Sequence, residues 1–172
     1  MLEVEMEIKL GILHDGVNEF HIETTAGELG FEKDDDTWLL FPEKISVYIE
    51  VQKQSDRYYI KTKLLTTAHF LCDRCLDDFT QEIKSSFQLY YLKSFEDKVS
   101  DNSYRFLSAN TNEIDMTEDV IENLLLAVPM KKLCKEDCSG LCANCGVNLN
   151  KQKCSCKRDE IDPRWAKLKN LK

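Results

Sequence analysis

The chain has 172 residues, of which 42% are hydrophobic and 31% are charged, and its formal net charge is −8. This length and composition suit a folded protein with a substantial hydrophobic core and exclude a chain that is disordered throughout. No apolar run is long enough to span a membrane, and the acidic, alternating N-terminus is unlike a signal peptide. We therefore expect a cytoplasmic protein whose thiols stay reduced.

The first hundred residues consist mainly of predicted β-strands. Apolar and charged residues alternate from Val4 to Leu10 and from Ile45 to Val51, as in strands with one buried face. Asp15-Gly16 marks a turn into a further strand, and residues 57–71 and 83–92 are rich in Tyr, Ile, Thr and Leu. No helical segment separates these strands, so we expect an antiparallel sheet or a partly open barrel.

Helices are predicted only later in the chain. In residues 116–128 the apolar side chains fall on one helical face, with Asp115 or Thr117 as the cap and Pro129 as the stop. A second, short helix should begin at Asp162, which can cap it, with a proline at the first helical position. The predicted fold class is α+β, with the first helix packed on the sheet.

The chain is predicted to divide into two parts. Residues 1–128 would form the mainly antiparallel body, and residues 129–172 a small Cys-rich module with the C-terminal helix. The module carries eleven basic and five acidic residues, whereas the body carries 12 basic and 26 acidic ones. This asymmetry indicates a basic surface for an anionic partner on an otherwise acidic protein. The module has almost no apolar periodicity, so something other than a hydrophobic core must hold it.

Eight cysteines supply that alternative, and their spacing is typical of zinc sites. Two residues between cysteines let both sulfurs face one ion. Gly146, directly after one such pair, tolerates the left-handed turn that follows a ligand. Tetrahedral zinc takes four thiolates, and eight divide into two sets. One set would be local, comprising Cys142, Cys145, Cys154 and Cys156. The other would join Cys72 and Cys75, from a strand hairpin, to Cys134 and Cys138, just after the helix.

Other assignments of the cysteines stay open at this point. Cys138 can exchange into the local set and Cys154 or Cys156 can be a spectator, so we expect one or two Zn²⁺ ions per chain. Disulfides would need an oxidising compartment. An iron–sulfur cluster also uses four thiolates, but the polar, Lys-rich surroundings favour zinc. A redox switch that releases zinc on oxidation uses the same residues.

Catalysis is not expected. Catalytic zinc keeps an open position and usually has His or carboxylate ligands, yet all three histidines lie outside the Cys-rich segment. The sequence contains no nucleophile elbow, P-loop or paired-carboxylate motif. We therefore assign no catalytic residue and no small-molecule substrate, and we expect no membrane association.

Several motifs resemble one known family. They are Cys72-Asp73-Arg74-Cys75-Leu76, the helix end Leu124-Leu125-Leu126-Ala127-Val128-Pro129, the stretch from Gly140 to Asn150, Cys154-Ser155-Cys156, and the final Asp162-Pro163-Arg164-Trp165-Ala166-Lys167-Leu168. In this order they resemble the YceD-like family of large ribosomal RNA subunit accumulation proteins, also catalogued as domain-of-unknown-function family 177. The resemblance covers roughly residues 40–172 and is most specific over 134–168.

The resemblance implies a bacterial cytoplasmic protein that supports synthesis, processing or stability of 23S ribosomal RNA. Ribosomal RNA, a pre-ribosomal particle or a large-subunit ribosomal protein would be its partner. The basic residues predicted to contact RNA phosphates are Lys131, Lys132, Lys151, Lys153, Lys157, Arg158, Arg164 and Lys167. One alternative is an adaptor whose acidic body holds a basic ribosomal protein without touching RNA, and another is a redox-sensing zinc protein.

Overall fold

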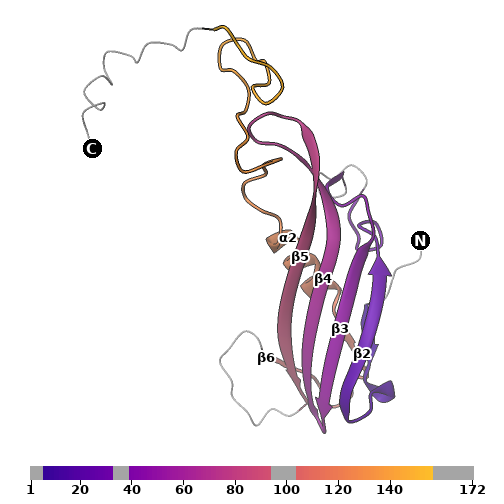
Figure 1. The fold of residues 1–172 in the computed structure, drawn as a ribbon. Coiled ribbons are helices and arrows are strands. Elements are labelled where there is room, and N and C mark those ends of the chain that lie inside the picture. Colours follow the sequence, from indigo (N-terminus) through magenta and orange to yellow (C-terminus); the bar gives the residue numbers. More distant parts are fainter. Residues whose placement is uncertain (1–5, 33–38, 94–103, 157–172) are drawn as a thin grey trace, which may run out of the picture.

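The structure is a computed structural model that describes residues 6–32, 39–93 and 104–156. Its largest element is a five-stranded sheet in the order β2-β3-β4-β5-β6 (Figure 1). The bounds of its strands are β2 Gly16–Thr24, β3 Ile45–Gln54, β4 Arg57–Leu71, β5 Asp78–Leu92 and β6 Tyr104–Phe106. The other elements whose bounds lie within the described residues are a two-stranded ribbon of β1 (Glu7–Lys9) and β7 (Glu113–Asp115), a 3₁₀ turn η1 (Leu10–Ile12) and helix α2 (Thr117–Leu126). The predicted α+β fold is confirmed.

Alternation along the strands determines which face of the sheet is buried. In β4, residues 58, 60, 62, 64, 66, 68 and 70 are buried, while their neighbours are half-buried or exposed. Because side chains of a strand point alternately to opposite faces, this pattern gives the sheet one apolar and one polar face. The pairings β2–β3, β3–β4 and β4–β5 are all antiparallel, as predicted.

The pairing of β6 departs from the expectation. β6 joins the edge of β5 in parallel, from Tyr90↔Tyr104 to Leu92↔Phe106. The sequence predicted a mainly antiparallel body, and β6 is the parallel exception at its edge. The chain between Leu92 and Tyr104 is long enough to bring β6 back beside β5, and three paired residues suffice to add the strand.

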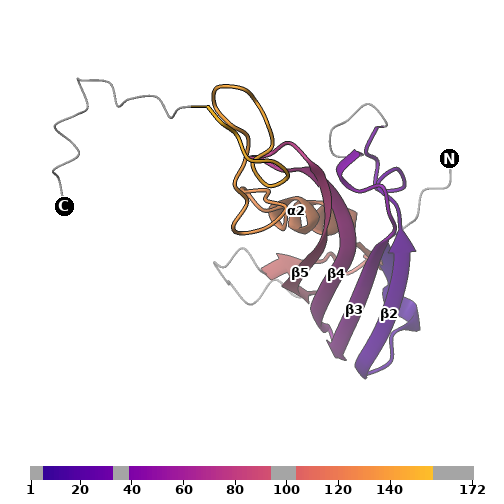
Figure 2. The same cartoon turned by 45° about the horizontal axis from the view of Figure 1, so that its top comes forward.

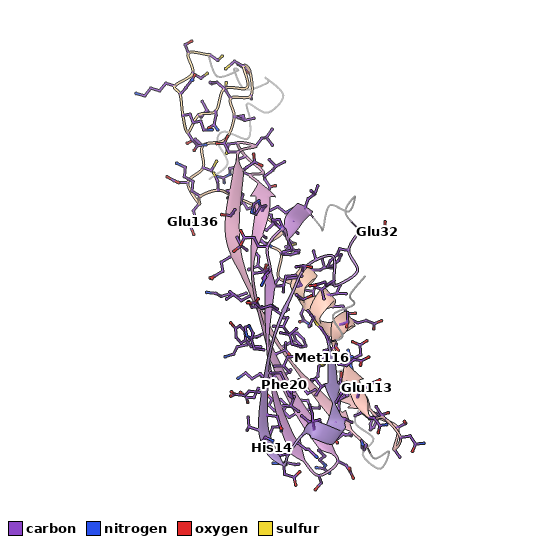
Figure 3. The ribbon with its side chains drawn as sticks, turned by 90° about the vertical axis from the view of Figure 1, so that its right-hand side faces the viewer. His14, Phe20, Glu32, Glu113, Met116 and Glu136 are labelled. Carbon is purple, nitrogen blue, oxygen red and sulfur yellow. The ribbon has the colours of Figure 1, made fainter. Side chains whose placement is uncertain are left out.

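One face of the large sheet carries the hydrophobic core. Figure 3 views the sheet edge-on, with α2 and the β1–β7 ribbon on the same side of it. Met6 and Ile8 of the ribbon region and Val120 and Leu124 of α2 pack into one buried cluster with apolar residues of β3, β4 and β5. The opposite face has no cover among the described residues.

Helix α2 is shorter than predicted, and Asp115, one of its two predicted caps, bonds to its first residue. It ends at Leu126 rather than near residue 128, and the Asp115 carboxylate accepts a hydrogen bond from the backbone N–H of Thr117 (2.8 Å). Its Asp119 side chain is 4% exposed and forms a two-pronged ion pair with Arg105 of β6. The short parallel strand is therefore bound to the helix as well as to β5.

From residue 129 to 156 the described chain consists of turns and loops, with one isolated bridge between Leu141 and Asn148. This segment sits at the far tip of the β4–β5 hairpin (Figure 2). The predicted C-terminal helix from Asp162 lies outside the described residues. In the part of the chain that is described, no helix is long and apolar enough to cross a membrane.

Candidate metal centres

The β4–β5 hairpin extends well beyond the rest of the sheet. β3 pairs with β4 only as far as Leu65, so residues 66–71 pair with β5 alone. Six residues at about 3.3 Å each make an extension of roughly 20 Å. Cys72 and Cys75 lie in the turn at its tip, beyond Phe70, where the hydrophobic core ends.

Both Cys-x2-Cys pairs adopt the same turn. At the hairpin tip, the N–H of Leu76 donates to the carbonyl of Cys72 and the N–H of Cys72 to the carbonyl of Asp77, both at 2.9 Å. Gly146 and Cys142 repeat this pattern, again with both bonds at 2.9 Å. The residue after the second cysteine has positive φ in each case, 58° at Leu76 and 73° at Gly146. The glycine predicted to take a left-handed conformation does so.

The eight sulfurs gather in two groups of four. In each group, the four Sγ atoms all lie within 4.8 Å of one another. We call Cys72, Cys75, Cys134 and Cys138 the inner site, and Cys142, Cys145, Cys154 and Cys156 the outer site. These are the two sets drawn from the spacing. That they are metal ligands stays a prediction.

The spacing of the sulfurs suits a tetrahedral ion. With metal–sulfur bonds of about 2.3 Å, the sulfurs of a tetrahedral site lie about 3.8 Å apart. Cys72 and Cys138 are 3.8 Å apart, and Cys75 and Cys134 are 3.7 Å apart. Two separations in the outer site are 3.9 and 3.3 Å. All eight cysteines are free thiols. Each group can therefore hold one metal ion.

The two sites differ in their exposure to solvent. Cys72, Cys75 and Cys138 are at most 3% exposed and pack against Phe79, Leu133 and Leu141. Cys134 is the most open member of the inner site. In the outer site no cysteine is fully buried, and Cys145 and Cys156 are exposed. Water and small reagents thus reach the outer site more easily.

The inner site contains thiols of opposite acidity. Burial opposes ionisation of Cys72, but surrounding backbone N–H groups outweigh it and lower the pKa of this thiol to about 6. Burial and neighbouring sulfurs raise the pKa of Cys134 to about 12. Once one thiolate forms, its negative charge opposes ionisation of the next. A bound cation removes this conflict and stabilises all four thiolates together.

The outer site has the same division. The backbone N–H groups of Cys145 and Asn144 lower the pKa of Cys142 to about 6. The neighbouring sulfurs of Cys154 and Cys145 raise the pKa of Cys156 to about 12. In each four-cysteine group, binding of a cation would therefore displace the remaining thiol protons.

Residues of the hairpin turn hold the second half of the inner site. Asp73 exchanges backbone and side-chain hydrogen bonds with Lys132, at 2.8 and 2.7 Å. The guanidinium of Arg74 donates to the carbonyl of Cys138 at 2.8 Å. These contacts of Asp73 and Arg74 could not be predicted from the sequence, because the two segments are about sixty positions apart and only the fold brings them together.

A second set of contacts joins residues 140–156, which carry the outer site and are here called the outer loop, to the inner site. The amide of Asn150 donates to the sulfur of Cys138 at 3.2 Å. The carboxylate of Asp77 accepts from the Asn148 amide and from the Lys151 ammonium, both at 2.9 Å. The hydrogen bond from Lys151 contributes most to lowering the pKa of Asp77. The cysteine spacing contains no signal for these contacts.

The predicted phosphate-binding residues occupy different environments. Lys131 and Lys153 are exposed and form no ion pair within the described chain. Lys132 is half-buried, with its ammonium 5.5 Å from the centre of the Phe70 ring, and Lys151 is bound to Asp77. The remaining four, Lys157, Arg158, Arg164 and Lys167, lie outside the described residues.

The fold and the clusters define a protein with a mainly antiparallel sheet and two four-cysteine groups that can each hold a metal ion. The chain belongs to the YceD family, described as large ribosomal RNA subunit accumulation protein YceD, whose profile matches residues 60–172. That description names a role in accumulation of the large-subunit ribosomal RNA, not an enzymatic activity.

Individual relatives agree with this assignment. A chloroplastic YCED homolog 1 of Arabidopsis thaliana, named a large ribosomal RNA subunit accumulation protein, is 38% identical over 60 residues, which are 35% of this chain and 19% of that protein. An uncharacterized protein of Mycobacterium tuberculosis is 31% identical over 100 residues, 56% of this chain and 47% of its own length. The chain thus spans less than half of these curated relatives. No solved structure matches.

Proposed function

We propose that both cysteine groups bind Zn²⁺ and that the ions are structural. Four thiolates close the coordination shell of zinc and leave no position for a substrate. The outer loop has few buried apolar side chains to fold around, and structural zinc in small modules contributes about 10 kcal/mol or more of folding free energy. On this proposal, residues from 129 onward form a zinc-held unit, and the protein works where thiols stay reduced, as in the bacterial cytoplasm.

We further propose that the protein is a non-enzymatic ribosome-biogenesis factor. It would support synthesis, processing or stability of 23S ribosomal RNA by binding the RNA within a pre-ribosomal particle. The observation that carries this proposal is the family assignment, together with the concentration of positive charge in the metal-bearing segment. Its basic side chains would neutralise RNA phosphates while the zinc ions keep the loops that carry them in place.

Among the described residues, Lys131 and Lys153 fit this role best because both are exposed and neither forms an ion pair with another described residue. Lys151 fits less well, since its ammonium is bound to Asp77. From the sequence, Lys157, Arg158, Arg164 and Lys167 extend the same positive charge. The proposal therefore places the contact on the module and leaves the acidic body facing away from the RNA.

The test measures binding of the purified, zinc-loaded protein to large-subunit ribosomal RNA over a range of salt concentrations. Binding through phosphates weakens steeply with salt, and each lost contact lowers the slope of log affinity against log salt by about 1. The double variant Lys131→Gln, Lys153→Gln should reduce this slope by up to about 2. Lys63→Gln, an exposed lysine of β4 on the open sheet face, is the matched control.

Equal effects of the double variant and of the control would contradict the placement of the RNA contact. Absence of salt-dependent RNA binding would contradict the mechanism itself. Binding of a large-subunit ribosomal protein that survives the lysine changes but fails when sheet carboxylates are neutralised would instead support the adaptor alternative.

A further inference from the structure

We propose that the inner and outer sites bind metal cooperatively and that Asn150 is the residue that couples them. The inference rests on the proposed occupancy of both sites by zinc. It goes beyond that occupancy, because metal binding at the solvent-open outer site would order part of the buried inner site and so raise its metal affinity. Hydrogen bonds that cross from one site to the other support it.

The first crossing contact is made by the side chain of Asn150. Its Nδ2 donates to the sulfur of Cys138 at 3.2 Å, and its Oδ1 accepts from the backbone N–H of Ser139 at 2.9 Å. One amide thus contacts an inner-site sulfur and also the residue next to it. Partners that donate to a metal ligand fix its orientation and charge, and their loss typically lowers metal affinity about 10–100-fold.

The position of Asn150 depends on the outer site. Along the chain it lies between Cys145 and Cys154, within the loop that the outer ion would close. A tight turn holds Asn150 in place. In this turn the Oδ1 of Asn148 accepts from the backbone N–H of Asn150 at 2.9 Å, and the carbonyl of Asn148 accepts from the backbone N–H of Lys151 at 3.1 Å. The loop has no apolar core of its own, so we expect its order to be lost with the outer ion.

Asp77 provides the second crossing contact. Its carboxylate accepts from Asn148 and Lys151 of the outer loop, and its backbone carbonyl accepts from the N–H of Cys72 in the inner site. Because Cys72 is fully buried, this carbonyl lies at the closed end of the inner site. The outer loop therefore contacts the inner site at both of its halves, the hairpin turn and the segment around Cys138.

Coupling of metal affinity between the two sites must be reciprocal, by thermodynamic linkage. If an ordered outer loop raises the affinity of the inner site by some factor, an occupied inner site raises the affinity of the outer site by the same factor. The difference in exposure then decides the order of loss. A chelator or oxidant reaches the outer ion first, and its removal loosens the ion that is buried.

The experiment measures how fast the inner cysteines become accessible. Native mass spectrometry first counts the zinc ions in each variant. The protein is then treated with iodoacetamide without a chelator, so that the outer ion stays bound in the wild type, and alkylation of Cys72, Cys75, Cys134 and Cys138 is followed by peptide mass spectrometry. The outer site is disabled with Cys145→Ser and Cys156→Ser, both at exposed positions. Circular dichroism checks that the sheet stays folded in every variant.

The alkylation rates are compared as a double-mutant cycle between the outer site and Asn150. With Asn150 present, disabling the outer site should speed alkylation of the inner cysteines about tenfold. In an Asn150→Ala background the inner cysteines should already react fast, and disabling the outer site should change the rate less than twofold. Asn150→Asp, which keeps an acceptor for Ser139 but removes the donor to Cys138, should behave like Asn150→Ala. Gln152→Ala, an exposed neighbour on the same loop, should keep the full tenfold effect.

Two outcomes overturn the inference in different ways. If the wild-type chain carries two zinc ions and the inner cysteines react equally fast with and without the outer site, the sites are independent and only the coupling is wrong. The same holds if the tenfold effect persists in Asn150→Ala. If the wild-type chain carries no zinc, the proposed zinc occupancy fails, and the coupling with it.

Discussion

Replacing Gly140 with alanine tests the docking of the outer loop on the hairpin turn. Gly140 has a φ of 72°, and a Cβ at this position would lie 3.0 Å from the carbonyl oxygen of Arg74. That oxygen also accepts a hydrogen bond from the N–H of Leu141 at 3.0 Å. The new methyl group would therefore press on the backbone atom that holds the loop to the hairpin.

The structure contains a matched control for the magnitude. Gly146 has a φ of 73°, but a Cβ there meets nothing within 4 Å. Gly146→Ala should cost only the left-handed backbone penalty, about 1 kcal/mol. Gly140→Ala should cost this penalty plus about 1–3 kcal/mol for overpacking against backbone. The difference between the two variants isolates the close approach from the positive φ.

Hydrogen exchange of the Leu141 amide, measured on the zinc-loaded protein by NMR, reports this local stability. We expect Gly140→Ala to lower the free energy of opening at Leu141 by about 2–4 kcal/mol, against about 1 kcal/mol for Gly146→Ala. A difference between the two variants smaller than about 0.5 kcal/mol would refute the reasoning, because the contact at Arg74 would then relax without cost.

Three further predictions concern the sheet body and the hairpin turn. The Oγ1 of Thr62 is buried and has no hydrogen-bond partner in the described chain, so Thr62→Val should raise the free energy of unfolding in urea by about 1 kcal/mol. Asp119→Asn should lower it by about 1–2 kcal/mol at pH 7, because it removes the carboxylate that pairs with Arg105. Leu76 has a φ of 58° and is 63% exposed, so Leu76→Gly should relieve backbone strain and lose little packing. After the greater entropy of glycine in the unfolded chain is subtracted, the turn should gain about 0.5 kcal/mol of stability. The measurement is the rate at which zinc is released to a chelator, which should fall; a faster release would contradict this prediction.

The sequence predicted the parts of the fold that depend on local periodicity. The long strand expected over residues 57–71 is β4, because alternating burial leaves a direct trace in the residue pattern. The helix expected near 116–128 is α2, although its last turn falls short of the proline. The parallel pairing of β6 left no such trace, since three residues that join an edge strand carry no periodic signal.

The candidate sites divide in the same way. The grouping of the cysteines into two sets of four follows from their spacing along the chain and from the number of thiolates that zinc accepts. The contacts of Asp77 and Asn150 could not be predicted, because each joins residues whose distance in space is set by the fold. Lys151 shows the limit of a charge count, which cannot distinguish a free ammonium from one held by a carboxylate.

The distal part of the β4–β5 hairpin links the hydrophobic core to the cysteine groups. Beyond Leu65 these two strands pair only with each other, and the hydroxyl of Thr66 donates to the carbonyl of Lys44 at 3.1 Å. Ala68 and Phe70 nevertheless remain buried in the core. Phe79 of β5 packs against both the core and the inner site, so a displacement of the cysteine-bearing tip would disturb the packing of the sheet body (Figure 1).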